Sequence, residues 1–181
     1  RTSRRQRQMC IRDSILYVMC GIFGYIDNNN NELDLDKLRI EGYKIQHRGP
    51  DNSNEYIGNN IYLLFHRLSI NDQSYKGNQP MILPDYPHII LMCNGEIFNY
   101  NDLQHENNFS LYSQSDCEII IHMYIKYGIR NTLLQLSGDF AFFILDLKNN
   151  LKFLARDPFG VRSFYFSETD NHNYIFSSEL K

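Results

Sequence analysis

Short apolar runs alternate with polar segments along the chain, and their lengths predict strands and helices in a definite order. Residues 20–26 are apolar and rich in β-branched and aromatic side chains, which is typical of a strand. Apolar residues then recur at helical spacing over 34–47, so we expect a helix with one buried face. HRGPD at 47–51 should end it, because proline disfavours helical geometry in the preceding residue. Residues 61–65 and 88–93 are two further predicted strands.

The second half of the chain begins with a predicted helix and ends with predicted strands. Ser115 and Glu118 have the spacing of a capping box, in which each side chain accepts a backbone N–H of the first turn. The helix should continue through 119–127 and end at Gly128. The remaining predicted strands are 140–147 and 151–155, joined in a hairpin by the turn 148–150, and 162–166 and 174–177. This order favours an α+β domain with mainly antiparallel sheet.

Composition places the chain among globular proteins with one domain. It has 181 residues, of which 43% are hydrophobic and 22% charged, so wholesale disorder is excluded. No apolar run is long enough to cross a bilayer, and we expect no membrane partner.

Charge is spread unevenly between the N-terminus and the rest of the chain. Residues 1–18 hold five arginines against Asp13, a net charge of +4, so the total of −3 leaves −7 for residues 19–181. This acidic body lacks the basic surface that nucleic-acid binding needs, and we expect no nucleic-acid partner. The basic segment shows no useful helical or strand period. We interpret 1–19 as an extension that is either removed or non-native, favouring the second, and 20–181 as the domain.

Cysteine usage fits a reducing compartment, and we expect a cytoplasmic protein. The chain has four cysteines, and those at 20, 93 and 117 lie far apart without a C-x-x-C pair. No histidines gather near them, so a zinc site is not predicted.

The dipeptide Met19-Cys20 carries the first chemical signal. Trimming of the methionine would leave Cys20 with a free α-amine beside its thiol. Such an amine titrates at about pKa 7.7–8.0, so it can act as a base toward its own side chain. Taken alone, Cys20 is more often an ordinary buried strand cysteine.

Eight motifs in a fixed order favour a catalytic role for Cys20 over that of a buried strand cysteine. They are MCGIFGYI (19–26), HRGPD (47–51), HRLSI (66–70), NGEIFNY (94–100), SDCE (115–118), LSGDFAF (136–142), RDPFGVR (156–162) and SSELK (177–181). On these motifs the chain from Cys20 onward resembles the class II glutamine amidotransferases, and most closely the N-terminal glutaminase domains of glutamine-dependent asparagine synthetases. The Pro-Asp after Arg48-Gly49 favours the asparagine synthetases over other members. The resemblance implies an N-terminal-nucleophile hydrolase fold, a four-layer αββα sandwich with two mainly antiparallel sheets.

The resemblance also implies roles for individual residues. Cys20 would attack the side-chain amide of glutamine, while the Asn94 side chain and the Gly95 N–H stabilise the oxyanion. In this interpretation Gly95 is small to leave room for the substrate. Arg67, rather than Arg48, would bind the substrate carboxylate, and Asp116 its ammonium group. The further implied substrate-binding residues are Leu68, Ser69, Ile70, Asn71 and Glu96.

Histidines receive a structural interpretation. Family members often carry a residue between the histidine and the Arg-Leu-Ser-Ile run, whereas His66 directly precedes Arg67 here. We therefore expect His66 to have a structural role. HRGPD is expected to shape a turn near the active site, and Cys93 and Cys117 to be packing residues.

The resemblance implies a partner domain that this sequence does not contain. In a full-length parent, a C-terminal synthetase domain would use ATP, Mg²⁺ and aspartate to form asparagine from the released ammonia. No cofactor is expected in residues 20–181, and the domain could be part of a homodimer. Two alternatives remain open: a different ammonia acceptor, as in β-lactam-forming or sugar-transferring relatives, and an inactive module whose Cys20 stays blocked by the extension.

Overall fold

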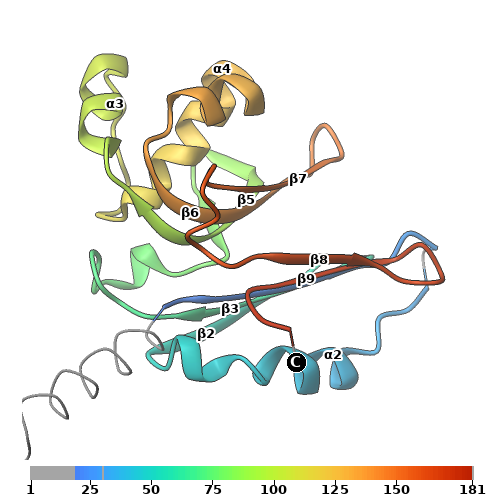
Figure 1. Ribbon diagram of the computed structural model, residues 1–181. Coiled ribbons are helices and arrows are strands. Elements are labelled where there is room, and N and C mark those ends of the chain that lie inside the picture. Colours follow the sequence, from blue (N-terminus) through green and yellow to red (C-terminus); the bar gives the residue numbers. More distant parts are fainter. Residues whose placement is uncertain (1–18, 30, 181) are drawn as a thin grey trace, which may run out of the picture.

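Two antiparallel sheets pack face to face in the computed structural model, which describes residues 19–29 and 31–180 (Figure 1). The extension predicted at 1–19 thus lies, apart from Met19, outside the described residues. The first sheet has the order β2 (Asn52–Ile57), β3 (Ile61–Arg67), β1 (Gly21–Ile26), β9 (Tyr174–Ser177) and β8 (Tyr165–Glu168). The second has the order β4 (Met81–Leu83), β5 (Tyr86–Ile97), β6 (Gly138–Asp146) and β7 (Leu151–Arg156).

Helices cover the outer faces of both sheets. α2 (Leu35–Tyr43) lies below the first sheet, and α3 (Tyr100–Asn107) and α4 (Ile119–Gln135) lie above the second (Figure 1). Short 3₁₀ turns lie between α2 and β2 at Gln46–Arg48, between β3 and β4 at Tyr75–Gly77, and directly before α4 at Asp116–Glu118. The predicted four-layer αββα sandwich is therefore confirmed.

Side-chain alternation along the strands divides the apolar residues among three layers. In β1, Ile22 and Ile26 face the second sheet, while Phe23 faces α2. In β5, Ile90 and Met92 face the first sheet, while Leu91 packs under α3 and α4. Burying both faces of each sheet explains why these strands are apolar almost throughout.

Most predicted elements are present, with corrected boundaries. The strand predicted at 88–93 extends over Tyr86–Ile97 and so contains Asn94 and Gly95. The helix predicted at 34–47 starts with an Asp34 side-chain cap on the Lys37 N–H, but ends at Tyr43. The strand predicted at 162–166 occupies 165–168 instead. Sequence patterns missed β2, β4 and α3, which are short or polar.

The capping box predicted at Ser115 is wrong. The Ser115 side chain makes no cap hydrogen bond. Glu118 instead accepts from the backbone N–H groups of Tyr112 and Ser113, both at 2.7 Å, and lies 3.1 Å from His122 Nε2. The glutamate thus holds the preceding loop rather than its own helix start.

Gly128 breaks helical geometry in α4, as the sequence predicts. Its φ of 72° and ψ of 166° lie outside the helical region, yet the chain resumes a helix that reaches Gln135. None of the helices in residues 19–29 and 31–180 is long and apolar enough to span a membrane.

Candidate functional site

Three residues of the predicted site extend the inward-facing rows of three strands. Cys20 continues the row of β1, Arg67 that of β3 and Asn94 that of β5. The apolar members of these rows are Ile22 and Ile26, Leu63 and Phe65, and Ile90 and Met92. Cys20, Arg67 and Asn94 therefore meet between the two sheets, at the end of the sandwich where the apolar core between the sheets ends.

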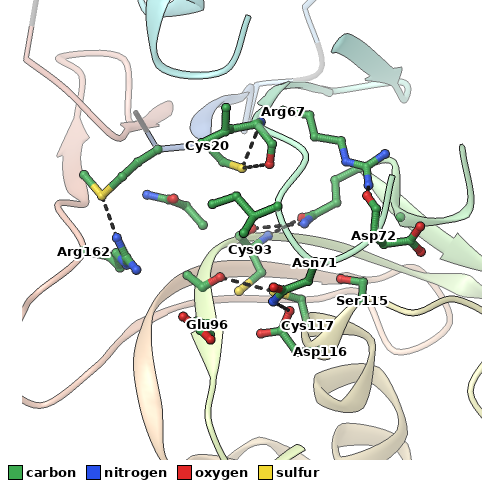
Figure 2. Close-up of a pocket in the computed structure, with 17 residues that line it drawn as sticks. Cys20, Arg67, Asn71, Asp72, Cys93, Glu96, Ser115, Asp116, Cys117 and Arg162 are labelled. Carbon is green, nitrogen blue, oxygen red and sulfur yellow. Dashed lines mark hydrogen bonds between the residues drawn. The ribbon is translucent and has the colours of Figure 1, made fainter. Parts of the chain in front are cut away.

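A cavity of about 110 Å³ occupies this end of the sandwich (Figure 2). Of the ten residues that the sequence assigns to the site, nine line the cavity: Cys20, Arg67, Leu68, Ile70, Asn71, Asn94, Gly95, Glu96 and Asp116. The exception is Ser69, whose backbone N–H donates to Asp51 Oδ2 at 2.7 Å and fixes the turn beside the cavity.

The Cys20 thiol is held by the backbone of Leu68. The Leu68 N–H donates to Sγ at 3.3 Å, and the thiol lies 3.6 Å from the Leu68 carbonyl oxygen, to which it donates. Burial raises the pKa of the Cys20 thiol, and the Leu68 contact together with the positive charges of Arg67 and Arg48 opposes this only in part. The thiol therefore rests protonated and needs a base to become a nucleophile.

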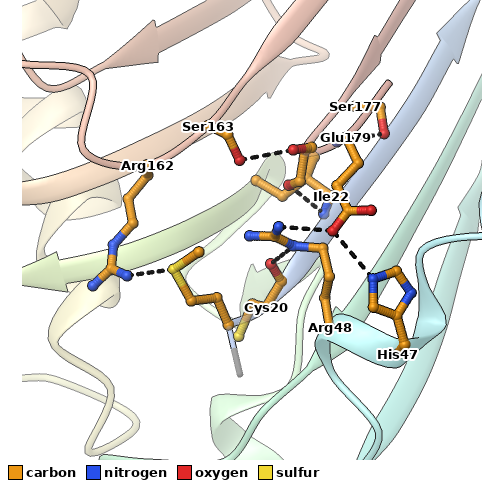
Figure 3. Close-up of polar contacts among 10 residues, drawn as sticks. Cys20, Ile22, His47, Arg48, Arg162, Ser163, Ser177 and Glu179 are labelled. Carbon is orange, nitrogen blue, oxygen red and sulfur yellow. Dashed lines mark hydrogen bonds and ion pairs between the residues drawn. The ribbon is translucent and has the colours of Figure 1, made fainter. Parts of the chain in front are cut away.

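Arg48 anchors the backbone of Cys20, a contact that the sequence did not predict. Its Nε donates to the Cys20 carbonyl at 3.0 Å, and its Nη1 pairs with Glu179 Oε1 at 3.0 Å (Figure 3). HRGPD thus does shape the surroundings of the cavity, as predicted, but through its arginine as well as its turn. A Cβ on Gly49 would lie 2.2 Å from the His66 carbonyl oxygen, so the turn packs directly on β3.

Asn94 is buried beside the cavity with an unused donor. The residue is 2% exposed, and its Nδ2 has no hydrogen-bond partner among the described residues. A buried amide left unpaired costs about 1–3 kcal/mol, so this nitrogen is an expensive feature unless a ligand uses it.

Packing against the neighbouring strand requires Gly95 to be small, a reason that the sequence did not suggest. A Cβ there would lie 2.2 Å from the Asp139 carbonyl oxygen and 2.6 Å from Phe140 Cα. The neighbouring strand β6 therefore excludes a side chain at this position.

The backbone N–H of Gly95 points away from β6. Both backbone groups of Cys93 bond the Gln79 side chain on the opposite edge of β5, and the Ile97 N–H on the same edge donates to Asp116. Because alternate residues of a strand direct their N–H groups to the same edge, Gly95 shares this direction. Its N–H is therefore not part of the β5–β6 ladder.

Arg67 is built into the loop that follows β3. Its Nη1 donates to the Ser74 carbonyl at 2.8 Å and to Asn78 Oδ1 at 2.6 Å, and its Nη2 donates to the Asp72 carbonyl. These bonds use three of its five N–H donors. Gly77 packs against the guanidinium, since a Cβ there would lie 2.6 Å from Nη2.

Asp116 is buried at the start of the helical segment. Its Oδ2 accepts from the Ile97 N–H at 2.6 Å, and its Oδ1 accepts from Asn71 Nδ2 at 3.0 Å. The carboxylate therefore faces the cavity in a fixed orientation, opposite in charge to Arg67 (Figure 2).

His66 lies outside the cavity, which agrees with its predicted structural role. It is fully buried, with Nε2 3.0 Å from the Gly42 carbonyl and Nδ1 2.7 Å from Ser53 Oγ. A carbonyl can only accept, so Nε2 carries the proton. Burial lowers the pKa of His66, which keeps the ring neutral.

Sequence reasoning missed Asp72 and Gln79, which also line the cavity. Asp72 accepts from the Ser74 and Gln114 N–H groups at 2.7 and 2.9 Å and so joins the loop after β3 to the loop before Asp116. Sequence reasoning could not find the contact of Asp72 with Gln114 or that of Gln79 with Cys93, because each joins segments distant in sequence.

Cys93 and Cys117 are free thiols in the walls of the cavity (Figure 2). Their mutual hydrogen bond and burial raise the pKa of Cys117 well above its usual value. Among residues 19–29 and 31–180, no group of three or more acidic, histidine or cysteine side chains could hold a metal ion.

Comparison with known proteins gives consistent relatives. Glutamine-hydrolyzing asparagine synthetase from Bos taurus is 39% identical over 168 residues, and the human and Gallus gallus enzymes are 38% identical over the same length. Each alignment covers 90% of this chain but 29% of the relative. The chain therefore spans less than a third of the length of these curated relatives.

A solved structure shares the fold. Glutamine phosphoribosylpyrophosphate amidotransferase from B. subtilis, complexed with ADP and GMP, matches with a TM-score of 0.56 at 20% identity, covering 93% of this chain and 38% of that chain. The resemblance predicted from the sequence motifs is confirmed at family level, since the glutamine amidotransferase domain family matches residues 19–181. The chain therefore belongs to the family of glutamine amidotransferase domains.

Proposed function

We propose that the domain hydrolyses the side-chain amide of L-glutamine to glutamate and ammonia through a thioester on Cys20. The observation that carries this proposal is the unpaired, buried Nδ2 of Asn94 in the cavity that also holds the Cys20 thiol. A donor fixed in place before the reaction, in a site shielded from water, is what a developing oxyanion requires.

The first chemical step is activation and attack. The α-amine of a matured Cys20 takes the proton of its own thiol, and the thiolate attacks the amide carbon of glutamine. The carbonyl π electrons move onto oxygen, where Asn94 Nδ2 and the Gly95 N–H donate to the oxyanion. The C–N bond then breaks, the amine returns its proton to the leaving nitrogen, and ammonia departs.

The second step regenerates the enzyme. Water attacks the thioester carbon with the same amine as base, and collapse of the oxyanion releases glutamate and the Cys20 thiol. The sum is one glutamine and one water converted to one glutamate and one ammonia, without a cofactor in this domain.

Charge complementarity supports glutamine as the substrate. Arg67 supplies a planar cation for the α-carboxylate, and Asp116 an anion for the α-ammonium. Leu68, Ile70, Asn71 and Glu96 complete the walls around them. A glutamine analogue without the α-carboxylate or the α-ammonium would leave the charge of Arg67 or Asp116 without its counterpart, so such analogues should bind poorly.

The acceptor of the ammonia lies outside this chain. We propose that the domain is the glutaminase part of a longer asparagine synthetase, because the curated relatives carry that name and are more than three times as long as the aligned region. ATP, Mg²⁺ and aspartate would bind the additional synthetase domain, and we assign no described residue to them. A cytoplasmic location and a homodimer remain predictions.

Maturation of the N-terminus decides between an active and an inert domain. Met19 precedes Cys20 in the cavity wall, and its Sδ lies 2.6 Å from Arg162 Nη1 (Figure 3). A peptide bond on Cys20 removes the amine that serves as base. Residues 1–19 must therefore be absent from the active form.

Intact-mass measurement combined with a glutaminase assay tests the proposal. Protein that starts at Cys20 should release glutamate and ammonia from L-glutamine, and Cys20→Ala should lower this more than about 10³-fold while unfolding at the same temperature. Hydrolysis by a form that retains residues 1–19, or full activity in Cys20→Ala, would disprove the mechanism. Asparagine formation by the longer parent from aspartate, ATP and glutamine identifies the acceptor.

A further inference from the structure

The Gln79 side chain forms hydrogen bonds with the backbone of Cys93, the residue just before Asn94. Its Oε1 accepts from the Cys93 N–H at 2.5 Å, and its Nε2 donates to the Cys93 carbonyl at 3.1 Å. The residue is 5% exposed, so no water competes strongly for either bond. One side-chain amide thus pairs with both peptide groups that flank the Cys93 Cα.

This pairing extends the edge of the sheet beyond β4, which begins only at Met81. Met81 lies opposite Leu91, and extending that antiparallel register by two residues places Gln79 opposite Cys93. Pro80, between them, has no N–H to donate. The Gln79 side chain therefore replaces a strand residue at the edge of β5 beside the cavity.

The opposite edge of β5 is held independently by β6. Cys93 pairs with Phe142 there, and Asn94 pairs with Ala141. With Gln79 on one side and β6 on the other, the peptide that joins Cys93 to Asn94 is fixed from both edges.

The direction of the Asn94 side chain depends on this backbone. Its Nδ2 has no hydrogen-bond partner among residues 19–29 and 31–180, so no bond to that nitrogen holds the amide in place. A shift of the strand at Cys93 would therefore be transmitted directly to the position of the donor.

Gln79 also ends the loop that holds Arg67, the residue proposed to bind the substrate carboxylate. Arg67 bonds Ser74 and Asn78 in this loop, and Asp72 ties the loop to Gln114, close to Asp116. One continuous segment therefore connects the group proposed to bind the carboxylate with the strand proposed to bind the oxyanion.

We propose that Gln79 is a positioning residue for glutamine hydrolysis, which holds the Cys93–Asn94 peptide so that Asn94 Nδ2 meets the oxyanion. This inference rests on the proposed function. A purely structural role, in which Gln79 only closes the edge of β5, would affect folding but would not single out the step that Asn94 assists.

The test compares Gln79→Met, which keeps length but loses both bonds, with Gln79→Glu, which keeps an acceptor for the Cys93 N–H. In protein verified to start at Cys20, Gln79→Met should lower kcat about 10–100-fold, because a misplaced donor loses part of the stabilisation that its removal would lose entirely. KM should stay within about threefold, since the charges that bind glutamine are untouched. The rate at which iodoacetamide alkylates Cys20 should not change.

A double-mutant cycle with Asn94→Ala separates positioning from structure. If Gln79 acts through Asn94, adding Gln79→Met to Asn94→Ala should lower kcat by less than about threefold further. Gln79→Glu should fall between the wild type and Gln79→Met, and it keeps the comparison available if Gln79→Met does not fold. Gln135→Met, an equal change at an exposed position, is the control for kcat and unfolding temperature.

Independent losses would overturn the inference. Effects of Gln79→Met and Asn94→Ala that multiply, or a Gln79→Met variant with normal kcat, would show that Gln79 does not act through Asn94. Glutamate release by the unmodified protein, measured in the same series, distinguishes a failure of the proposed function from a failure of this inference.

Discussion

Two buried nitrogen atoms, Nδ2 of Asn94 and Nη2 of Arg48, have no hydrogen-bond partner among the described residues. Both belong to residues close to Cys20: Asn94 lines the same cavity, and Arg48 bonds the Cys20 carbonyl. Folding alone would favour pairing or removing such groups. Their retention at this end of the sandwich is what a site that binds a ligand, rather than a closed core, would show.

Replacing Asn94 should separate activity from stability. Asn94→Ala is expected to lower kcat by about 10²–10³-fold, or about 2.7–4 kcal/mol, the typical loss for one oxyanion donor. Stability should stay within about 1 kcal/mol of the wild type, because losing an unpaired buried amide offsets the lost packing. Glutamate release and urea unfolding measure the two effects, with the exposed Asn101→Ala as control. Unchanged turnover would remove Asn94 from the mechanism.

Replacing Gly95, in contrast, should lower both stability and activity. The added methyl of Gly95→Ala would collide with the backbone of β6, so we expect a loss of stability of about 1–3 kcal/mol as well as lower activity. Thermal unfolding together with kinetics checks this. A stable variant with only a raised KM would instead favour the original interpretation, in which glycine leaves room for the substrate.

At the scale of elements, the loop before α4 is held by a charge rather than by a cap. Burial by itself would raise the pKa of Glu118, but hydrogen bonds from His122, Ser113 and Tyr112 outweigh it, and the pKa lies below its usual value. The carboxylate form is therefore the one that stabilises this loop, and through it the segment carrying Asp116.

The lowered pKa predicts a defined acid sensitivity. Because the folded pKa lies below the unfolded one, the contribution of Glu118 is complete above about pH 4.5 and is lost as pH falls through the folded pKa. Wild type should exceed Glu118→Gln in stability by about 1.5–3 kcal/mol at pH 7, and this difference should shrink below pH 4.5. Urea unfolding at several pH values measures it, with the exposed Glu106→Gln as control. A difference that does not depend on pH would contradict the assignment.

The sequence was a better guide to the strands and helices, and to which residues line the cavity, than to the contacts between side chains. Long apolar stretches such as β6 and the first half of α4 have one reasonable interpretation, and eight ordered motifs identified the residues around the cavity. It could not predict that β6 excludes a side chain at Gly95, that Arg48 bonds Cys20, or that Gln79 completes β5. Each of these contacts joins segments whose pairing is set by the tertiary fold, and no local spacing records it.

At the scale of the whole molecule, the last strand completes the sheet around the first. β1 lies between β3 and β9, and Phe176 of β9 stacks on Phe143 of the other sheet, with ring centroids 4.6 Å apart. Gly24 leaves the space that this ring fills, since a Cβ there would lie 2.1 Å from Phe176 Cζ.

Removing this ring should loosen the whole sandwich. Phe176→Ala is expected to cost about 3–5 kcal/mol of unfolding free energy, as for other fully buried aromatic residues. Phe159→Ala, at a position 89% exposed, should change it by less than about 0.5 kcal/mol. Equilibrium unfolding in urea compares the two, and similar effects would refute the role given to β9.

The ion pair between Arg48 and Glu179 has a consequence for synthesis on the ribosome. A chain emerges from its N-terminus, at about 5–20 residues per second. Until Glu179 has emerged, the Arg48 guanidinium, which donates to the Cys20 carbonyl, lacks its carboxylate partner. The edge of β1 that pairs with β9 is also open until then. A nascent chain should thus remain unable to liberate ammonia until nearly every residue described here has been translated.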